Sequence, residues 1–269
     1  MKKYIGLLVL CLSTLYACQD NTYWEFSHDI NLDEVSPNGV VFQGENLWIS
    51  DTDNNQLVLI NQEGKILKRV EDLDRPMHIS SDEGSVFIAD YGSDQILKMS
   101  ADGVMDTIAL VTLPDGPAGI DVQADKLIVA DFYNHQIIYQ DGNKNNTFGT
   151  KGKEGAGLHY PTDVQFFNDL IYVADAYNNL VKIFDMDGQY RMTIGKAEEM
   201  TATTGVYVNT QELITVDFEN DRVITYDHKG KLLDIIDEGF HGPTDIITKD
   251  DQLYVLNFKG KFISVFNKS

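Results

Sequence analysis

The sequence is poor in cysteine, proline and basic residues, and each shortage excludes a class of protein. Its 269 residues include two cysteines, too few for a small fold held together by disulfide bonds. The 6 prolines and 21 glycines are too few for a collagen-like or low-complexity chain. Lysine and arginine number 21 against 42 aspartate and glutamate residues, a formal net charge of −21. We expect no nucleic-acid partner, because phosphate binding needs clustered basic side chains.

Long apolar runs are also missing, apart from one near the start of the chain. That run covers residues 4–15 and follows two lysines. It is too short to cross a bilayer, which takes roughly 20 apolar residues. A short basic start followed by such a run is typical of a secretory signal peptide. We therefore expect the first residues to direct export.

The segment LYAC that ends at Cys18 resembles the lipobox of bacterial lipoproteins. In that motif a small residue precedes a cysteine, which is lipidated and becomes the mature N-terminus. The resemblance implies a signal peptide over 1–17, a lipidated Cys18 with a tether over 18–22, and a place in the bacterial cell envelope. Gln19 stands where an Asp often retains lipoproteins in the inner membrane, so the outer membrane is favoured. The alternative is an ordinary cleaved signal peptide with an unrelated cysteine.

Six short apolar runs, each ending in Asp or Asn, recur 39 to 44 residues apart. These anchor residues are Asp51, Asp90, Asp131, Asp175, Asp217 and Asn257. Fourteen residues before them stand Pro37, Pro76, Pro117, Pro161, Thr203 and Pro243, which we call the Pro positions. Each of the first five units holds four strand-like stretches separated by turns, which is the pattern of a β-propeller blade.

We therefore predict an all-β fold over residues 23–269, a six-bladed β-propeller with four antiparallel strands per blade. The sixth unit stops after its third strand, at 262–267, and an apolar-polar segment over 23–30 precedes the first Pro position. This N-terminal strand is predicted to complete the last blade and remove an open sheet edge. Two faces follow from the strand order, and we call the one that carries the turns between second and third strands the turn face.

One unit also resembles a known repeat in detail. The segment IYVADAYNNLVKIFDMDG at 171–188 is similar to the NHL repeat, and the resemblance extends over residues 37–269. It implies a six-bladed propeller that serves as a recognition platform.

The anchor carboxylates are interpreted as structural, because an Asp that recurs at a strand end can accept backbone N–H bonds from a turn. Positions that differ between the units are better candidate sites. Two residues after the Pro positions stand Gly39, His78, Gly119, Asp163, Gly205 and Asp245. The next inward positions are Val41, Ser80, Asp121, Gln165, Tyr207 and Ile247, because side chains alternate along a strand.

His78, Asp163 and Asp245 are predicted to lie around one mouth of the channel, with Asp121 deeper. One imidazole and two or three carboxylates could bind a divalent cation, calcium or zinc, or act as acid and base. The favoured alternative is a polar channel whose acids accept hydrogen bonds from backbone N–H groups.

Aromatic residues follow the anchor residues on the turn face. Tyr91, Tyr133 and Tyr177 are predicted to bind ligand together with the channel residues His78, Asp121, Asp163, Gln165, Tyr207 and Asp245. Aromatic rings there could stack on a sugar or another flat ligand. The alternative, favoured for residues directly after an anchor residue such as Tyr91, is packing between blades.

These features favour a membrane-anchored binding or protein-interaction module whose partner is a small molecule or an envelope protein. This function requires no cofactor, and no catalytic residue is predicted. The alternative is a metal-dependent lyase or hydrolase with its site at the channel mouth. Related amidating lyases place zinc-binding His directly after the Pro positions, where this chain has Asn38, Met77, Ala118, Thr162, Thr204 and Thr244.

Overall fold

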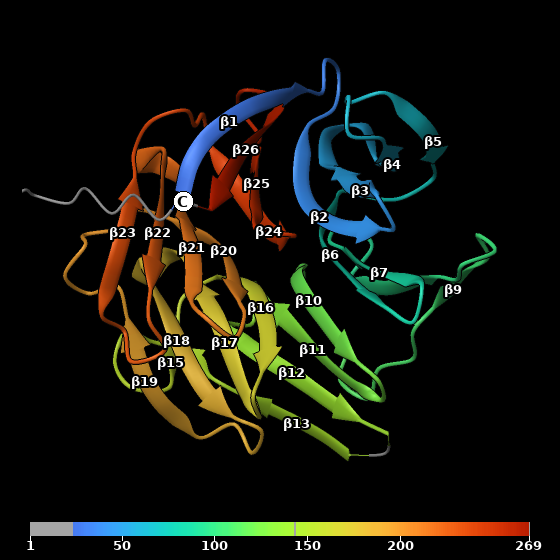
Figure 1. The fold of residues 1–269 in the computed structure, drawn as a ribbon. Helices are drawn as coiled ribbons and strands as arrows, with labels where there is room; N and C mark the ends of the chain where they lie inside the picture. The colour runs from blue at the N-terminus through green and yellow to red at the C-terminus, as the bar shows by residue number, and fades with distance from the viewer. Residues whose placement is uncertain (1–23, 143, 269) are drawn as a thin grey trace, which may run out of the picture.

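Six four-stranded antiparallel sheets surround a central channel in the computed structural model, which describes residues 24–142 and 144–268 (Figure 1). The predicted six-bladed propeller is confirmed. The predicted signal peptide (1–17), lipidated Cys18 and tether (18–22) lie outside the described residues. Within the described part of the chain, no helix has the length and apolar character needed to cross a membrane.

The first three blades follow one another along the chain. Blade 1 contains β2 (Pro37–Gln43), β3 (Asn46–Asp51), β4 (Gln56–Ile60) and β5 (Ile66–Val70). Blade 2 contains β6 (Pro76–Asp82), β7 (Ser85–Asp90), β8 (Gln95–Met99) and β9 (Met105–Thr107). Blade 3 contains β10 (Pro117–Gln123), β11 (Lys126–Asp131), β12 (Gln136–Asp141) and β13 (Lys144–Phe148).

The remaining blades complete the ring. Blade 4 contains β16 (Pro161–Phe167), β17 (Leu170–Asp175), β18 (Leu180–Asp185) and β19 (Tyr190–Ile194). Blade 5 contains β20 (Thr203–Val208), β21 (Leu213–Asp217), β22 (Arg222–Tyr226) and β23 (Leu232–Ile236). Blade 6 contains β24 (Pro243–Lys249), β25 (Gln252–Asn257), β26 (Phe262–Lys268) and β1 (Trp24–Asn31). Short 3-10 turns cover Thr52–Asn54, Ala176–Asn178 and Phe218–Asn220.

The N-terminal strand β1 closes the ring as predicted. It pairs antiparallel with β26, from Trp24 opposite Lys268 to Asn31 opposite Phe262. Figure 1 shows β1 in blue beside the red strands of the C-terminal end. Because β26 begins at the turn face, this register places Trp24 at the opposite face.

The core lies between the blades, in six clusters that each join two neighbouring sheets. Both faces of a blade are therefore buried, which explains why the second strands are nearly continuous apolar runs. One cluster packs Trp24 and Phe266 of blade 6 against Ile214 and Val216 of blade 5.

The anchor residues have the structural role that the sequence indicates, but with different donors. Each accepts, at 2.6–2.8 Å, a backbone N–H from the loop that enters its own blade: Ser36, Asp74, Asp115, His159, Thr201 and His241. In four blades an Asn three residues on adds a side-chain bond to the anchor carboxylate: Asn54, Asn134, Asn178 and Asn220. The anchor therefore ties the first strand's entry loop to the end of the second strand.

The glycine-rich segment before blade 4 forms β14 (Thr150–Lys151) and β15 (Gly157–Leu158), a short parallel pair. It encloses the fully buried Lys182, whose Nζ donates to the carbonyls of Lys153 and Gly157. The same Nζ lies 3.4 Å from the carboxylate of Asp175. The extra length of this unit thus supplies partners for a buried ammonium group, which would be costly without them.

Candidate functional site

The channel is lined by the first strand of every blade, and each of these strands has a bulge just after its Pro position. A bulge adds one residue to a strand and redirects neighbouring side chains. As a result, both the residue directly after the Pro position and the next one reach the channel in blade 2, where Met77 and His78 line the same cavity.

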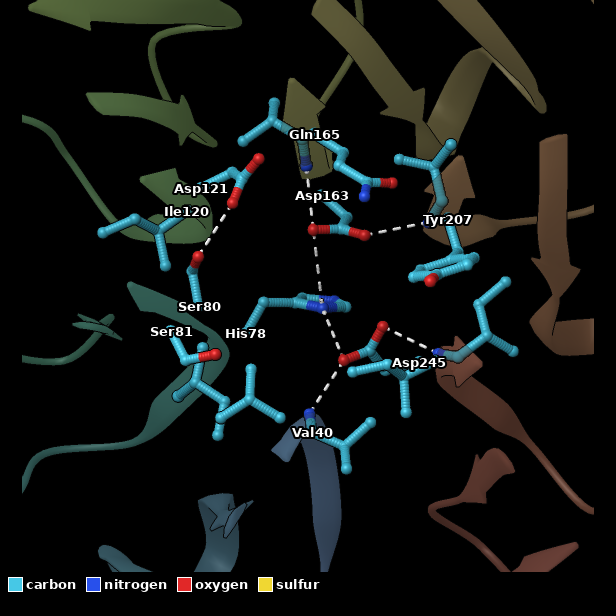
Figure 2. Close-up of a pocket in the computed structure, with 16 residues that line it drawn as sticks. Val40, His78, Ser80, Ser81, Ile120, Asp121, Asp163, Gln165, Tyr207 and Asp245 are labelled. Atoms are coloured by element: carbon cyan, nitrogen blue, oxygen red, sulfur yellow. Dashed lines mark hydrogen bonds and ion pairs between the residues drawn. The ribbon is translucent and has the colours of Figure 1, made fainter. Parts of the chain in front are cut away.

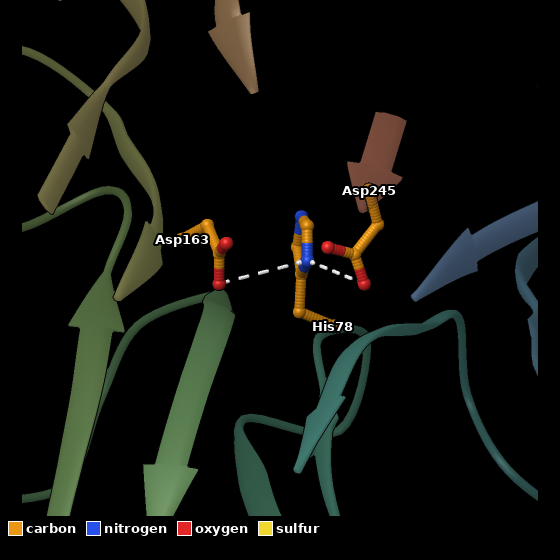
Figure 3. A group of neighbouring side chains, drawn as sticks. All are labelled: His78, Asp163 and Asp245. Atoms are coloured by element: carbon orange, nitrogen blue, oxygen red, sulfur yellow. Dashed lines mark ion pairs between the residues drawn. The ribbon is translucent and has the colours of Figure 1, made fainter. Parts of the chain in front are cut away.

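His78, Asp163 and Asp245 converge inside the channel from blades 2, 4 and 6 (Figure 3). His78 Nδ1 lies 3.6 Å from Asp163 Oδ1 and 3.5 Å from Asp245 Oδ2. The three residues are only 3, 5 and 6% exposed. The structure thus brings the predicted set together, but it places them in the channel interior and not around an open mouth.

The two carboxylates also join neighbouring blades. Asp163 accepts the N–H of Val206 in blade 5, and Asp245 accepts that of Val40 in blade 1, both at 2.8 Å. The following residues, Val164 and Ile246, donate their own N–H groups to the same carboxylates at 2.8 and 2.7 Å. These acids therefore satisfy backbone donors along the inner sheet edges, as the favoured sequence interpretation has it.

Asp121, at the next inward position of blade 3, also accepts backbone N–H groups from two blades. Its carboxylate accepts the N–H groups of Val122 and Phe166 at 2.9 and 2.8 Å, and Ser80 Oγ at 2.8 Å. Gln165 joins blades 4 and 5 through the backbone N–H and C=O of Val208.

Two cavities flank the cluster of His78, Asp163 and Asp245. One, of about 200 Å³, is bounded by the cluster and by Ser80, Asp121, Gln165 and Tyr207 (Figure 2). The other, of about 190 Å³, is lined by His78, by residues that follow the Pro positions, and by Phe218 and Phe258, which follow anchor residues on the turn face. His78 contributes to both, so the cluster separates the two halves of the channel.

The electrostatics of the cluster follow from burial and charge. Burial alone would lower the pKa of the His78 imidazole, but the carboxylates of Asp163 and Asp245 outweigh it and raise that pKa to about 9. Burial raises the pKa of Asp163, with His78 acting against the shift. Burial also raises the pKa of Asp121, to about 6, although its hydrogen bonds act against the shift.

Tyr91, Tyr133 and Tyr177 line neither cavity, and they belong to a separate cluster. Ring contacts with centroid distances of 4.3–6.4 Å connect Tyr91, Phe132, Tyr133, His135, His159, Tyr160 and Tyr177, which we call the aromatic patch. Tyr133 and Tyr177 are 50 and 60% exposed, whereas Tyr91 is half-buried. The patch lies over blades 2 to 4 on the turn face. The residues predicted to bind one ligand together therefore form two separate groups, one in the channel and one on the turn face.

His135 was not singled out from the sequence, although a positional signal existed. In all six blades the residue four after the anchor has positive φ. In five of them its side chain accepts a backbone N–H just before the next blade's Pro position. The acceptors are Asn55, Asp94, His135, Asn179 and Asp221, and the donors are Arg75, Gly116, Tyr160, Ala202 and Gly242. His135 thus holds Tyr160 in the patch.

Comparison with known proteins places the chain among β-propellers. A family described as DUF5128, 6-bladed beta-propeller, matches residues 152–241. Protein brain tumor of Drosophila melanogaster is 32% identical over 124 residues, which are 44% of this chain and 12% of that protein. The human E3 ubiquitin-protein ligase NHLRC1 is 33% identical over 95 residues, 31% of this chain and 24% of the ligase. The chain thus spans a quarter or less of these relatives' length.

Solved structures share the fold at low sequence identity. A streptogramin B lyase superposes with a TM-score of 0.69 at 17% identity, covering 90% of this chain and 86% of the lyase. The inactive H270A virginiamycin B lyase of Staphylococcus aureus, solved with quinupristin, gives 0.68 at 15% identity, covering 91 and 100%. At such identities the superpositions show a common fold alone.

Proposed function

We propose that this chain is a protein-interaction module of the bacterial cell envelope and that it recognises its partner through the aromatic patch. We also propose that a lipid on Cys18 holds it on the outer membrane. The observation that carries the proposal is the exposure of Tyr133 and Tyr177, 50 and 60%, within a continuous group of rings. Tyrosine is enriched among the residues that dominate protein interfaces.

A protein partner fits this surface better than a small molecule does. Ligand pockets are concave and enclose most of a small molecule, whereas the aromatic patch lies outside both channel cavities. Further apolar side chains are exposed in the loop that enters blade 3, where Val111 and Leu113 are 68 and 78% exposed. That loop contacts the patch through the backbone, because Tyr133 N donates to Asp115 O.

The direction of β1 supports a patch that faces away from the membrane. Trp24 lies at the face opposite the patch, and five residues separate it from Cys18. An extended segment of that length reaches roughly 17 Å. A lipid on Cys18 would therefore hold the opposite face near the bilayer and leave the turn face to a partner.

The lyase or hydrolase alternative is not favoured by the channel geometry. His78, Asp163 and Asp245 are at most 6% exposed, and both carboxylates are already engaged by two backbone N–H groups each. A catalytic acid or base must instead come within hydrogen-bond reach of a substrate.

Photo-crosslinking tests the interaction. A benzophenone side chain at Tyr133 or Tyr177 should crosslink one and the same envelope protein in cells, and a benzophenone at Tyr190, 36% exposed on β19, should not. The double variant Tyr133→Ala/Tyr177→Ala should then bind that protein at least about 10-fold more weakly, as expected for interface hot spots.

The matched variant Tyr190→Ala should bind as the unaltered chain does. The double variant, the Tyr190→Ala variant and the unaltered chain should melt at nearly the same temperature. Unchanged affinity of the double variant, or crosslinks at Tyr190 as frequent as at Tyr133, would remove the patch from the proposal. Crosslinks to saccharide alone would assign the patch to a small ligand instead.

Membrane attachment is tested separately. Cys18→Ser should move the protein from the detergent-extractable membrane fraction to the soluble envelope fraction and abolish incorporation of radiolabelled palmitate. Membrane retention of this variant would contradict the lipid anchor and leave the aromatic patch unaffected.

A further inference from the structure

Around the channel, glycine alternates with a larger polar residue at the second position after the Pro position, so that three polar side chains come from every other blade. Blades 2, 4 and 6 carry His78, Asp163 and Asp245, and the blades between them carry Gly39, Gly119 and Gly205 at the same position. Because glycine has no Cβ, the backbone of the next blade can lie close to the first strand at these positions. A Cβ on Gly39 would lie 2.7 Å from His78 Cα, and one on Gly119 would lie 2.6 Å from Asp163 Cα.

The donor atoms of this cluster are spaced as ligands of a common ion. The ligand atoms of the three residues lie within 4.8 Å of one another. The two contacts of His78 Nδ1, at 3.6 and 3.5 Å, exceed the 2.7–3.2 Å of ordinary N–H···O bonds. A tetrahedral ion with bonds of about 2.1 Å separates its ligands by about 3.4 Å. The two distances from His78 Nδ1 are close to this value.

The carboxylates are fixed in advance for such a role. Each is held by two backbone N–H groups, one from its own blade and one from the next. Carboxylate oxygens have further lone pairs, and Figure 3 shows the two carboxylates on either side of the His78 imidazole, each joined to its Nδ1 by an ion pair. Hydrogen bonds to ligating groups orient them and strengthen metal binding.

The negative charge of the cluster also favours a bound cation. Two buried carboxylates and one imidazole carry a formal charge of −2 when the imidazole is neutral, and buried charge is costly without a counter-charge. A divalent cation at the cluster would compensate both charges.

We propose that His78, Asp163 and Asp245 bind one divalent transition-metal ion of the zinc class at the centre of the channel. One nitrogen and two carboxylate oxygens suit zinc, whereas calcium takes 6–8 oxygen ligands at longer distances. The cavity of about 200 Å³ beside the cluster has room for a water molecule as a further ligand. The ion links alternate blades and stabilises the closed ring, and it does not depend on the aromatic patch.

Metal analysis of the full chain in detergent, without an added histidine tag, tests this site. After removal of metal with a chelator and addition of zinc chloride, one equivalent of zinc should remain bound, and the melting temperature should rise with zinc concentration. His78→Gln and Asp163→Asn should each weaken zinc binding by about 100-fold or more. Asp121→Asn, which removes a channel carboxylate outside the cluster, should bind zinc as the unaltered chain does.

Cobalt provides a test that needs no variant. Co²⁺ bound to the unaltered chain should give the intense visible absorption bands of a tetrahedral site, and zinc should displace them. Absence of stoichiometric zinc or of these bands overturns the proposal. Zinc retained equally by the His78→Gln and Asp163→Asn variants overturns it too, because the ion would then lie elsewhere, for example beside His135 and His159.

Discussion

Replacing Gly119 with alanine should destabilise the protein by about 3 kcal/mol, although it adds a single methyl group. The new Cβ would lie 2.6 Å from Asp163 Cα and 2.7 Å from Thr162 O. Both are backbone atoms of β16, which cannot yield as a flexible side chain would. Relief of the clash would separate blades 3 and 4 at the channel, where Asp121 accepts the N–H of Phe166.

Thermal unfolding of the alanine variant measures this effect. A loss of about 3 kcal/mol corresponds to a melting temperature lower by roughly 10 °C in a chain of this size. Gly44→Ala is the matched control, because a Cβ there meets nothing within 4 Å and the residue has φ of +61°. That variant should lose only about 1 kcal/mol, the cost of a left-handed alanine. Equal losses of unfolding free energy in the two variants would show that blades 3 and 4 accommodate a methyl group at Gly119 without strain.

The repeat explains why the architecture could be predicted from sequence. Six equivalent anchor residues at nearly constant spacing define the blades, and the truncated sixth unit predicts closure by the N-terminal strand. The channel-facing positions also followed, because Ser80, Asp121, Gln165 and Tyr207 line the cavity. These features depend on strand alternation, which is local in the sequence.

The depth of the candidate site could not be predicted in the same way. The position of His78 along the channel depends on the bulge after Pro76, which the simple alternation of side chains along a strand does not predict. The separation of Tyr133 and Tyr177 from the channel depends on how far each turn projects from the ring. Lys182 falls at a strand position that alternation leaves ambiguous, and its burial depends on a loop that begins some thirty residues earlier.

Removing the N-terminal strand should have the second large effect. A chain that begins at Leu32 lacks β1, so the backbone edge of β26 and the apolar surface under Trp24 and Ile30, 4 and 3% exposed, become accessible. Loss of Trp24 alone should cost about 3–5 kcal/mol, the usual range for a buried Trp→Ala change. An open edge beside exposed apolar side chains also invites pairing with another copy.

Size-exclusion chromatography and thermal unfolding of this shortened chain test the closure. We expect oligomers and a melting temperature far below that of the unaltered domain. A synthetic peptide covering Trp24–Asn31 should add itself to the open edge and restore a monomer, as donated strands do in other sheets. A peptide of the same composition in scrambled order should not, because only the native order places Trp24 and Ile30 on their buried positions.

A stable monomer without β1 would contradict this account of ring closure, and the consequence extends to the proposed attachment. The strand that completes blade 6 is also the segment that follows the proposed lipid anchor at Cys18. Any force on the anchor therefore reaches the ring first at the Trp24 end of the β1–β26 pairing. A propeller closed by its C-terminal strand alone would leave the tether outside the fold, and pulling on it would not load the sheet.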